Sequence, residues 1–204
     1  MSDRLTKADW IRHGLLTLAR HGPGGLKVGP MATALKVSRG SFYWHFADIA
    51  DFRTQLLQGW RDVSTDQVIE DLDDVAAPDR LKRLMRGAFA MKLTLERSVR
   101  AWAADDREVA AAVAAVDARR IGHIAALLAA GGVDADRAEQ RATFLYWAFL
   151  GQGLVGSRAH GTLTGEAMDE ISELFEQAPF LSREGEGDHA EHGGEGGAAG
   201  AREA

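Results

Sequence analysis

The chain of 204 residues contains no cysteine and only four prolines. The missing cysteines exclude a disulfide framework, a thiol nucleophile and a cysteine-based zinc site. The scarcity of proline, with Ala, Leu, Glu and Arg plentiful, favours helix throughout. No window shows the sustained alternation of Val, Ile and Thr that is typical of strands, so we expect almost no β-structure. The sequence therefore predicts an all-α protein.

Long hydrophobic runs are also missing. No apolar segment reaches the length of a membrane span, and the N-terminus has no apolar signal region. We therefore expect a cytoplasmic protein with no membrane partner.

Catalytic motifs are absent as well. The sequence has no Gly-rich phosphate loop, no Gly-x-Ser-x-Gly and no His-Glu-x-x-His. Asp105 and Asp106 are adjacent, so on a helix their carboxylates point apart. His13 and His21 have no acidic or sulfur partners nearby, and the His-x-x-His spacing near the C-terminus is a weak metal signal. We expect no catalytic residues, no metal and no cofactor, and hence no enzyme.

The charge of the chain is unevenly distributed. The formal net charge is −6. Residues 1–61 hold nine Lys or Arg against four Asp or Glu, a balance of +5, whereas the remainder has a balance of −11. A basic N-terminal module on an acidic body is the asymmetry expected if only one end meets phosphate.

Residues 26–46 have the pattern of two short helices joined by a tight turn. Pro30 suits the first turn of the first helix, where its missing N–H costs nothing. Ser38 offers a side-chain oxygen to the free N–H groups of the second helix. Phe42 and Phe46 are four residues apart and share one inward face of that helix. The pattern predicts a helix-turn-helix, and the alternative is an ordinary helical hairpin with a polar outer face.

The outer face of the second helix carries donors, a small hydroxyl and flat rings. Such side chains suit a helix laid in the DNA major groove, where base edges need donors and acceptors and phosphates need cations and N–H groups. Lys27 is expected to add a phosphate contact. The DNA-binding residues predicted from this pattern are Lys27, Ser38, Arg39, Gly40, Ser41, Tyr43, Trp44 and His45.

The run Val37-Ser38-Arg39-Gly40-Ser41-Phe42-Tyr43, followed by Phe46, resembles the signature of the TetR-type transcriptional regulators. The resemblance covers about the first 60 residues and implies a DNA-binding domain, a pocket in a second domain and a two-fold dimer. Three positions depart from the family pattern. Lys36 stands where Gly is usual in the turn, which requires a left-handed backbone or another turn. Gly29-Pro30 replaces charged residues, and Ile49 replaces a phosphate-contacting Lys, for which Arg53 is the proposed substitute.

The rest of the sequence predicts further helices. Thr6 with Asp9 can cap the first helix of the chain. Asp48 can cap a long helix from residue 48 to about 72 that joins the DNA-binding module to the rest. We divide the chain into a helix-turn-helix DNA-binding domain of three helices (1–50), a helical effector-binding and dimerisation domain (51–181) and a disordered tail (182–204).

Aromatic and methionine residues beyond residue 80 lie on separate helices that can converge on an apolar pocket with a few polar groups. For each of them plain core packing is the alternative. The candidates for the pocket are Met85, Phe89, Trp102, Arg119, His123, Phe144, Tyr146 and Trp147, and we expect Trp102 to be the most important. Residues 144–156 and 164–175 are the candidate dimer interface, because small residues there permit close helix approach.

The sequence thus predicts a homodimeric transcriptional repressor that leaves a palindromic operator when a small apolar or amphipathic effector binds. Two alternatives remain open: a helical carrier or enzyme with a structural N-terminal hairpin, and a dimeric DNA-binding protein without an effector. Neither the effector nor the operator sequence can be read from the chain.

Overall fold

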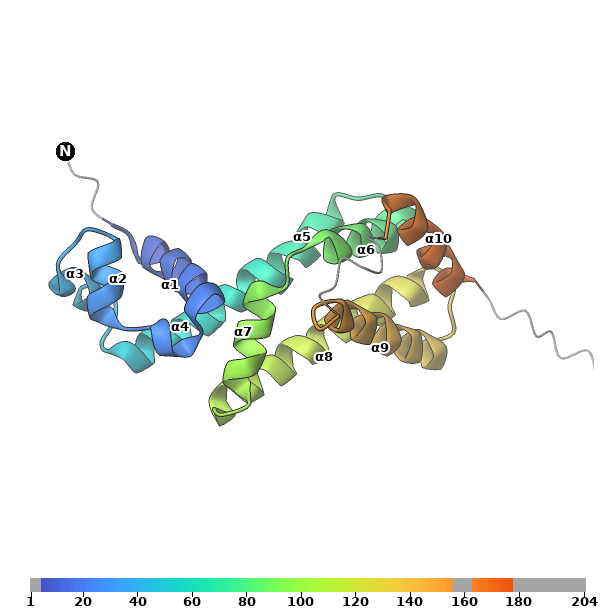
Figure 1. Ribbon diagram of the computed structural model, residues 1–204. Helices are drawn as coiled ribbons and strands as arrows, with labels where there is room; N and C mark the ends of the chain where they lie inside the picture. Colours follow the sequence, from blue (N-terminus) through green and yellow to red (C-terminus); the bar gives the residue numbers. More distant parts are fainter. Residues whose placement is uncertain (1–4, 156–162, 178–204) are drawn as a thin grey trace, which may run out of the picture.

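The computed structural model describes residues 5–155 and 163–177, and within these ranges every regular element is helical. The molecule is elongated, with the N-terminal helices at one end and α10 toward the other (Figure 1). The α-helices are α1 (Lys7–His21), α2 (Val28–Ala34), α3 (Arg39–Tyr43), α4 (Ile49–Arg61), α5 (Gln67–Asp73), α6 (Arg80–Ala90), α7 (Thr94–Ala103), α8 (Arg107–Ala130), α9 (Ala135–Gln152) and α10 (Gly165–Glu176). The all-α prediction is confirmed.

Helix α1 begins at the cap that the sequence predicts. The Thr6 side chain accepts from the Asp9 amide, and the Asp9 carboxylate accepts from the Thr6 amide at 2.9 Å. The two residues thereby satisfy each other's backbone donors. Gly22, with φ of 65°, ends the helix and leads into a short 3-10 turn, η1 (Pro23–Gly25).

The turn between α2 and α3 depends on a non-glycine residue in the left-handed region. Lys36 has φ of 57°, the first of the two conformations the sequence allowed it. The Val37 amide donates to the Ala32 carbonyl at 3.0 Å and closes the turn. Ser38 precedes α3 in an extended conformation, but its side chain makes no capping bond. The predicted role of the Ser38 oxygen is therefore wrong, and α3 is held by packing of Phe42 instead.

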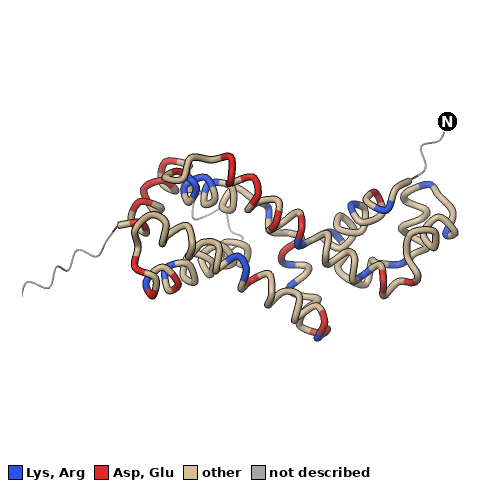
Figure 2. The backbone as a smooth tube through the Cα atoms, turned by 180° about the vertical axis from the view of Figure 1, so that it is seen from behind, with Lys and Arg blue, Asp and Glu red and all other residues tan. Residues whose placement is uncertain are grey.

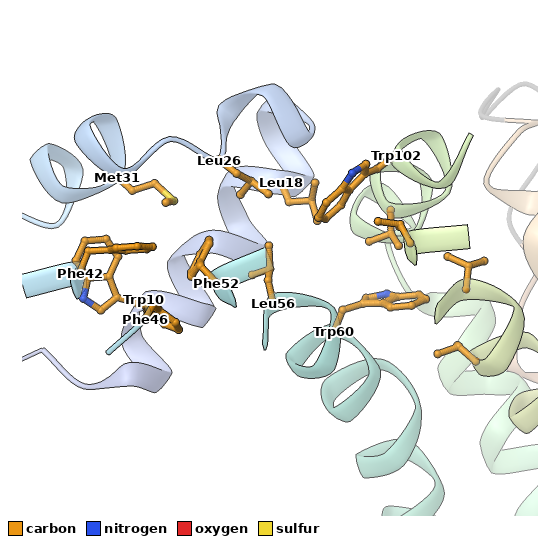
Figure 3. Packing of buried hydrophobic residues seen from close by; sticks show 14 of the residues in the cluster. Trp10, Leu18, Leu26, Met31, Phe42, Phe46, Phe52, Leu56, Trp60 and Trp102 are labelled. Carbon is orange, nitrogen blue, oxygen red and sulfur yellow. The ribbon is translucent and has the colours of Figure 1, made fainter. Parts of the chain in front are cut away.

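The N-terminal helices pack around a cluster of aromatic rings (Figure 3). Phe42 contacts Trp10, Phe46 and Phe52 with ring centroids 5.0–5.4 Å apart, and all four side chains are buried. Gly14 on α1 allows α4 to come close, because a Cβ there would lie 2.6 Å from the Phe52 ring. These contacts place α3 with its opposite face outward.

The long connecting helix begins at Asp48, whose carboxylate caps it through the Asp51 amide at 2.8 Å. It ends at Asp73, close to the predicted residue 72. The sequence did not predict the interruption between α4 and α5, a single π-helical segment, η2 (Asp62–Asp66). Such segments are rare and are frequently found at functional sites.

The C-terminal body consists of α5 to α10, with α8 and α9 packed along one another and α10 against α6. A second core, centred on Leu81, Met85, Leu128, Leu145 and Met168, fills this body. A 3-10 turn, η3 (Ala77–Asp79), precedes α6.

Helix α7 ties the two ends of the molecule together. It begins at Thr94 and packs against α1. Its Val99 and Trp102 belong to the first core, together with Trp60 of α4 (Figure 3). One continuous core thus crosses from the predicted first domain into α7 and the start of α8.

Some sequence predictions concern residues outside the described ranges. These are the disordered tail at 182–204, the His-x-x-His pair within it, and the end of the first dimer segment at Gly156. In the part of the chain that is described, no helix is both long and apolar enough to cross a membrane.

Candidate DNA-reading surface and effector cavity

Helix α3 presents an exposed polar and aromatic surface. Tyr43 is 58% exposed and Trp44, which caps the helix C-terminus, is 76% exposed, because Phe42 and Phe46 occupy the buried side. The other predicted DNA-binding residues that are exposed are Lys27, Ser38, Arg39 and Gly40, while Ser41 is half-buried. We call Lys27, Ser38, Arg39, Gly40, Tyr43 and Trp44 the reader surface.

Gly29, one of the departures from the family pattern, has a structural reason. A Cβ on Gly29 would lie 3.0 Å from the Nη2 atom of Arg39. The guanidinium of Arg39 therefore lies against the start of α2, and Gly29 leaves the room for it. Helix α2 begins at Val28, so Pro30 does not shorten it.

Two predicted DNA-binding residues lie elsewhere. The Nε2 atom of the half-buried His45 is 3.0 Å from the Leu5 carbonyl oxygen, so the ring braces the start of α1 instead of facing outward. Arg53 is half-buried on α4 and its guanidinium carbon lies 5.9 Å from the centre of the Trp102 ring. It points toward α7, and the structure does not place it as the substitute phosphate contact.

The charge asymmetry of the sequence is also a spatial one. Asp and Glu concentrate along the C-terminal body, most densely at the end farthest from the N-terminal helices (Figure 2). The Lys and Arg residues between positions 7 and 61 lie mostly at the opposite end (Figure 2). The electrostatic potential is therefore most favourable for an anionic partner at the reader surface.

The C-terminal body contains a partly open cavity of about 330 Å³. This size falls within the range of small-molecule pockets, roughly 300–1,000 Å³. Its walls come from the end of α4 and from η2, α5, α6, α7, α8 and α9, and most of the lining is apolar. The apolar residues that line it are Trp60, Val68, Ile69, Leu72, Leu81, Leu84, Met85, Ala88, Phe89, Met91, Leu93, Leu95, Ile124, Leu145 and Phe149.

Four of the eight predicted pocket residues line this cavity: Met85, Phe89, His123 and Tyr146. Trp102, expected to be the most important, does not. It is 6% exposed within the first core, and its Nε1 donates to Asp106 at 3.2 Å. The prediction was wrong because α7 turns this face toward α1 instead of toward the cavity.

Arg119, Phe144 and Trp147 are also outside the cavity. The Nε of Arg119 pairs with Asp66 at 2.7 Å on the outside of η2. Phe144 stacks on Phe175 of α10 and is 59% exposed, and Trp147 is 65% exposed. Both rings are exposed on α9, and Leu154 just after α9 and Leu174 of α10 are exposed as well, at 81% and 63%.

Sequence reasoning missed the polar cluster at the inner end of the cavity, which centres on Arg120 of α8. Its Nε donates to Thr65 Oγ1 at 2.9 Å and its Nη2 to Ser64 Oγ at 3.0 Å, both in η2. Its Nη1 and Nη2 donate to the buried Glu96 carboxylate at 3.1 and 3.2 Å. The Tyr146 hydroxyl accepts from Nη1 at 3.2 Å. One side chain thus joins η2, α7, α8 and α9.

Two further charges complete this cluster. Arg100 donates to Glu96 at 2.8 Å and to Asp117 at 2.6 Å, and the Tyr146 hydroxyl donates to Asp117 at 2.6 Å. Burial opposes the charge of Arg100, but the hydrogen bonds to Asp117 and the surrounding negative charges raise its pKa above the usual value. Burial also raises the pKa of Tyr146 to about 12, so the hydroxyl keeps its proton. Two cations face two anions, and the cluster is neutral.

A sequence signal for this cluster existed. Glu96 lies three residues before Val99 on the buried stripe of α7, and Arg120 lies four residues after Val116 on the buried stripe of α8. A charge on a buried stripe must be paired to be tolerated. The two spacings, however, do not show which residue pairs with each buried charge.

His123 is the remaining polar wall residue of interest. Its Nε2 is buried and has no hydrogen-bond partner among the residues that the structure describes. Burial lowers the pKa of His123, Arg119 and Arg80 nearby lower it further, and Asp73 opposes the shift. The ring is therefore neutral near pH 7.

Comparisons with known proteins agree with this architecture. No protein-family model and no curated protein sequence matches the chain. Among solved structures, the chain is similar to a TetR/AcrR-family transcriptional regulator, with 19% identity, coverage of 81% of this chain and 96% of the other, and a TM-score of 0.67. It is also similar to a transcriptional regulator from Saccharomonospora viridis solved in complex with choline, with 21% identity, coverage of 83% and 96%, and a TM-score of 0.64. A TetR-family regulator from Rhodococcus sp. matches at 17% identity over 82% and 96%, with a TM-score of 0.61.

These likenesses establish the fold: a helix-turn-helix of three N-terminal helices followed by a helical second domain, as in TetR-family structures.

Proposed function

We propose that this protein is a DNA-binding transcriptional regulator and that α3 reads the major groove. The supporting observation is the reader surface, where cations, hydroxyls and flat rings are exposed on α3 and on the residues beside it, while Phe42 anchors the other side of α3. Lys27 and Arg39 supply phosphate or base contacts. The fold shared with solved transcriptional regulators supports the same conclusion.

A salt-titrated binding assay tests this proposal, using the duplex that selection from a random-sequence library enriches. Binding should fall steeply with salt because each neutralised phosphate releases counterions. Lys27→Ala should weaken binding to all sequences and reduce the salt slope by about one. Arg39→Ala should also relax preference at one base pair, by about 1–3 kcal/mol if the contact is bidentate. Lys92→Ala, an exposed lysine at the cavity, is the matched control. Unchanged affinity in both reader variants would refute the proposal.

We further propose that the protein acts as a homodimer through the exposed apolar surface of α9 and α10. A contiguous exposed patch of large apolar side chains is typical of an interaction site. Arg fits in the monomer at Gly151, where nothing lies within 4 Å of an added Cβ, and at Leu154, which is 81% exposed. Either substitution should give folded monomers with weak operator binding. The control is Leu16→Arg on α1, and an intact dimer by light scattering in both variants would place the interface elsewhere.

The last part of the proposal is a repressor released from DNA by a small molecule in the cavity. Two reader helices must lie about 34–36 Å apart to bind one face of a duplex. The cavity wall includes Ser64 and Thr65 of η2, within the helix that leads to the reader, so a ligand there can bias the tilt of that helix. By reciprocity, operator must weaken effector binding by the factor by which effector weakens operator binding. Calorimetry with and without operator measures both sides, and equal effector affinities would support a carrier or an effector-independent DNA-binding protein instead.

A further inference from the structure

The two buried charged groups of the cavity wall, Arg120 and Glu96, are already bonded within the protein. A guanidinium has five N–H donors. In Arg120 one reaches Thr65, two are shared between Glu96 and Tyr146, and two are shared between Ser64 and Glu96. Both oxygens of Glu96 are occupied, one by Arg100 and the other by Arg120. An ionic ligand head at this end would be desolvated without gaining a counter-charge.

A positive charge already lies against two aromatic rings of the cavity wall. The guanidinium carbon of Arg120 lies 5.7 Å from the ring centre of Trp60 and 5.9 Å from that of Phe149. Aromatic faces are the usual partners of quaternary ammonium ligands. A ligand cation placed against these two rings would meet Arg120 and be repelled. In this respect the cavity is unsuited to a choline-like head group.

The remaining charges on the lining are exposed to water. Asp71, Arg83 and Lys92 are all exposed side chains. Ion pairs with exposed partners contribute little, about 0–1 kcal/mol, because water and salt screen them. They offer a ligand charge only a weak attachment at the edge of the cavity.

His123 differs from the other polar wall groups. Its Nε2 is buried and is not bonded to any other group in the described part of the chain. A neutral imidazole offers this nitrogen either as donor or as acceptor, depending on the tautomer. A buried polar atom without a partner costs free energy, and a ligand recovers that free energy when the imidazole turns and brings Nε2 to the cavity.

We propose that the cavity takes an uncharged, mainly apolar molecule carrying one hydrogen-bonding group, and that this group bonds His123 Nε2. The inference rests on the proposed function only in naming the cavity as the effector site.

Three matched ligands test the proposal by calorimetry on the full-length protein: 1-decanol, decanoate and decyltrimethylammonium. They share a chain and differ in the charge of the head. The alcohol should bind at least about tenfold more tightly than either ion, because a buried charge without a partner is costly. Tighter binding of decanoate or of the ammonium compound would overturn the proposal. Loss of decanoate binding in Arg83→Ala would then locate its attachment at the cavity edge.

The role of His123 is tested by substitution. His123→Phe keeps an aromatic ring and removes the nitrogen, so 1-decanol affinity should fall about three- to tenfold, the value of one hydrogen bond. His123→Gln should restore part of it. His21→Phe, an exposed histidine on α1, is the matched control, and thermal melts confirm that each variant folds. Unchanged 1-decanol affinity in His123→Phe would overturn the assignment. A bound alcohol that leaves operator affinity unchanged would instead contradict the proposed effector function and leave the ligand class intact.

Discussion

The buried arginine that joins four helical segments makes the sharpest stability prediction. Arg120 and Glu96 have side chains only 11% and 7% exposed. Removing one partner of a buried pair costs about 3–5 kcal/mol, because the other charge remains buried without compensation. Glu96 keeps Arg100 on one oxygen. We therefore expect the Arg120→Met variant to lose about 3 kcal/mol, the lower end of that range.

Urea unfolding at fixed protein concentration measures this loss. The adjacent Arg119→Met is the matched control, because Arg119 is 55% exposed and its pair with Asp66 should be worth about 0–1 kcal/mol. Adding Glu96→Leu to Arg120→Met should restore at least half of the loss, because it removes the uncompensated charge and leaves Arg100 paired with Asp117. A loss below about 1 kcal/mol in the single variant, or additive losses in the double variant, would refute the reasoning.

Five further substitutions have expected effects on stability, measured by denaturant or thermal unfolding, and the effector affinity of one of them is measured by calorimetry. Gly14→Ala should destabilise because its Cβ would lie 2.6 Å from a buried ring, whereas Gly87→Ala on α6, with nothing within 4 Å, should stabilise by about 0.5–1 kcal/mol. Trp102→Ala should cost about 3–5 kcal/mol as a core truncation while the effector affinity of the folded protein changes little. Lys36→Gly should be neutral to stabilising, since φ is 57° there. A hydrogen bond from Arg86 of α6 lowers the pKa of the Asp169 carboxyl below its unfolded value of 3.8. The contribution of this interaction to stability is therefore present above pH 3.8 and is lost as the pH falls through the lower pKa of the folded protein. Asp169→Asn should flatten that acid dependence.

The helix-turn-helix could be predicted in detail because its signals are local. The Thr6 cap, the turn at Lys36 and the Phe42 and Phe46 spacing each act within four residues. The structure has the cap and the spacing, and of the two turns left open at Lys36 it has the left-handed one. The Ser38 cap failed because packing of α3 made it unnecessary. The sequence shows that a glycine at position 29 is unusual. It does not show the reason, which is that the guanidinium of Arg39 lies against Gly29 across the turn.

The cavity was predictable only in part. Met85 and Trp102 are similar in sequence terms, since both are large apolar residues on an amphipathic helix. One lines the cavity and the other packs with α1. Each of these helices has buried residues on more than one side. The side that faces the cavity depends on how the neighbouring helices are oriented, and the periodicity of apolar residues does not give that orientation.

By itself, the sequence determined the all-helical class, the caps at Thr6 and Asp48 and the basic N-terminal part on an acidic body, because caps, periodicity and charge are properties of nearby residues. Only the tertiary structure decided that Arg120 bonds Glu96 and η2, that Arg53 faces Trp102 and that His123 Nε2 has no partner. The physical reason is that a buried charge requires a partner but does not specify which one. That choice is made by the packing of α7, α8 and α9, which brings together side chains far apart in the chain.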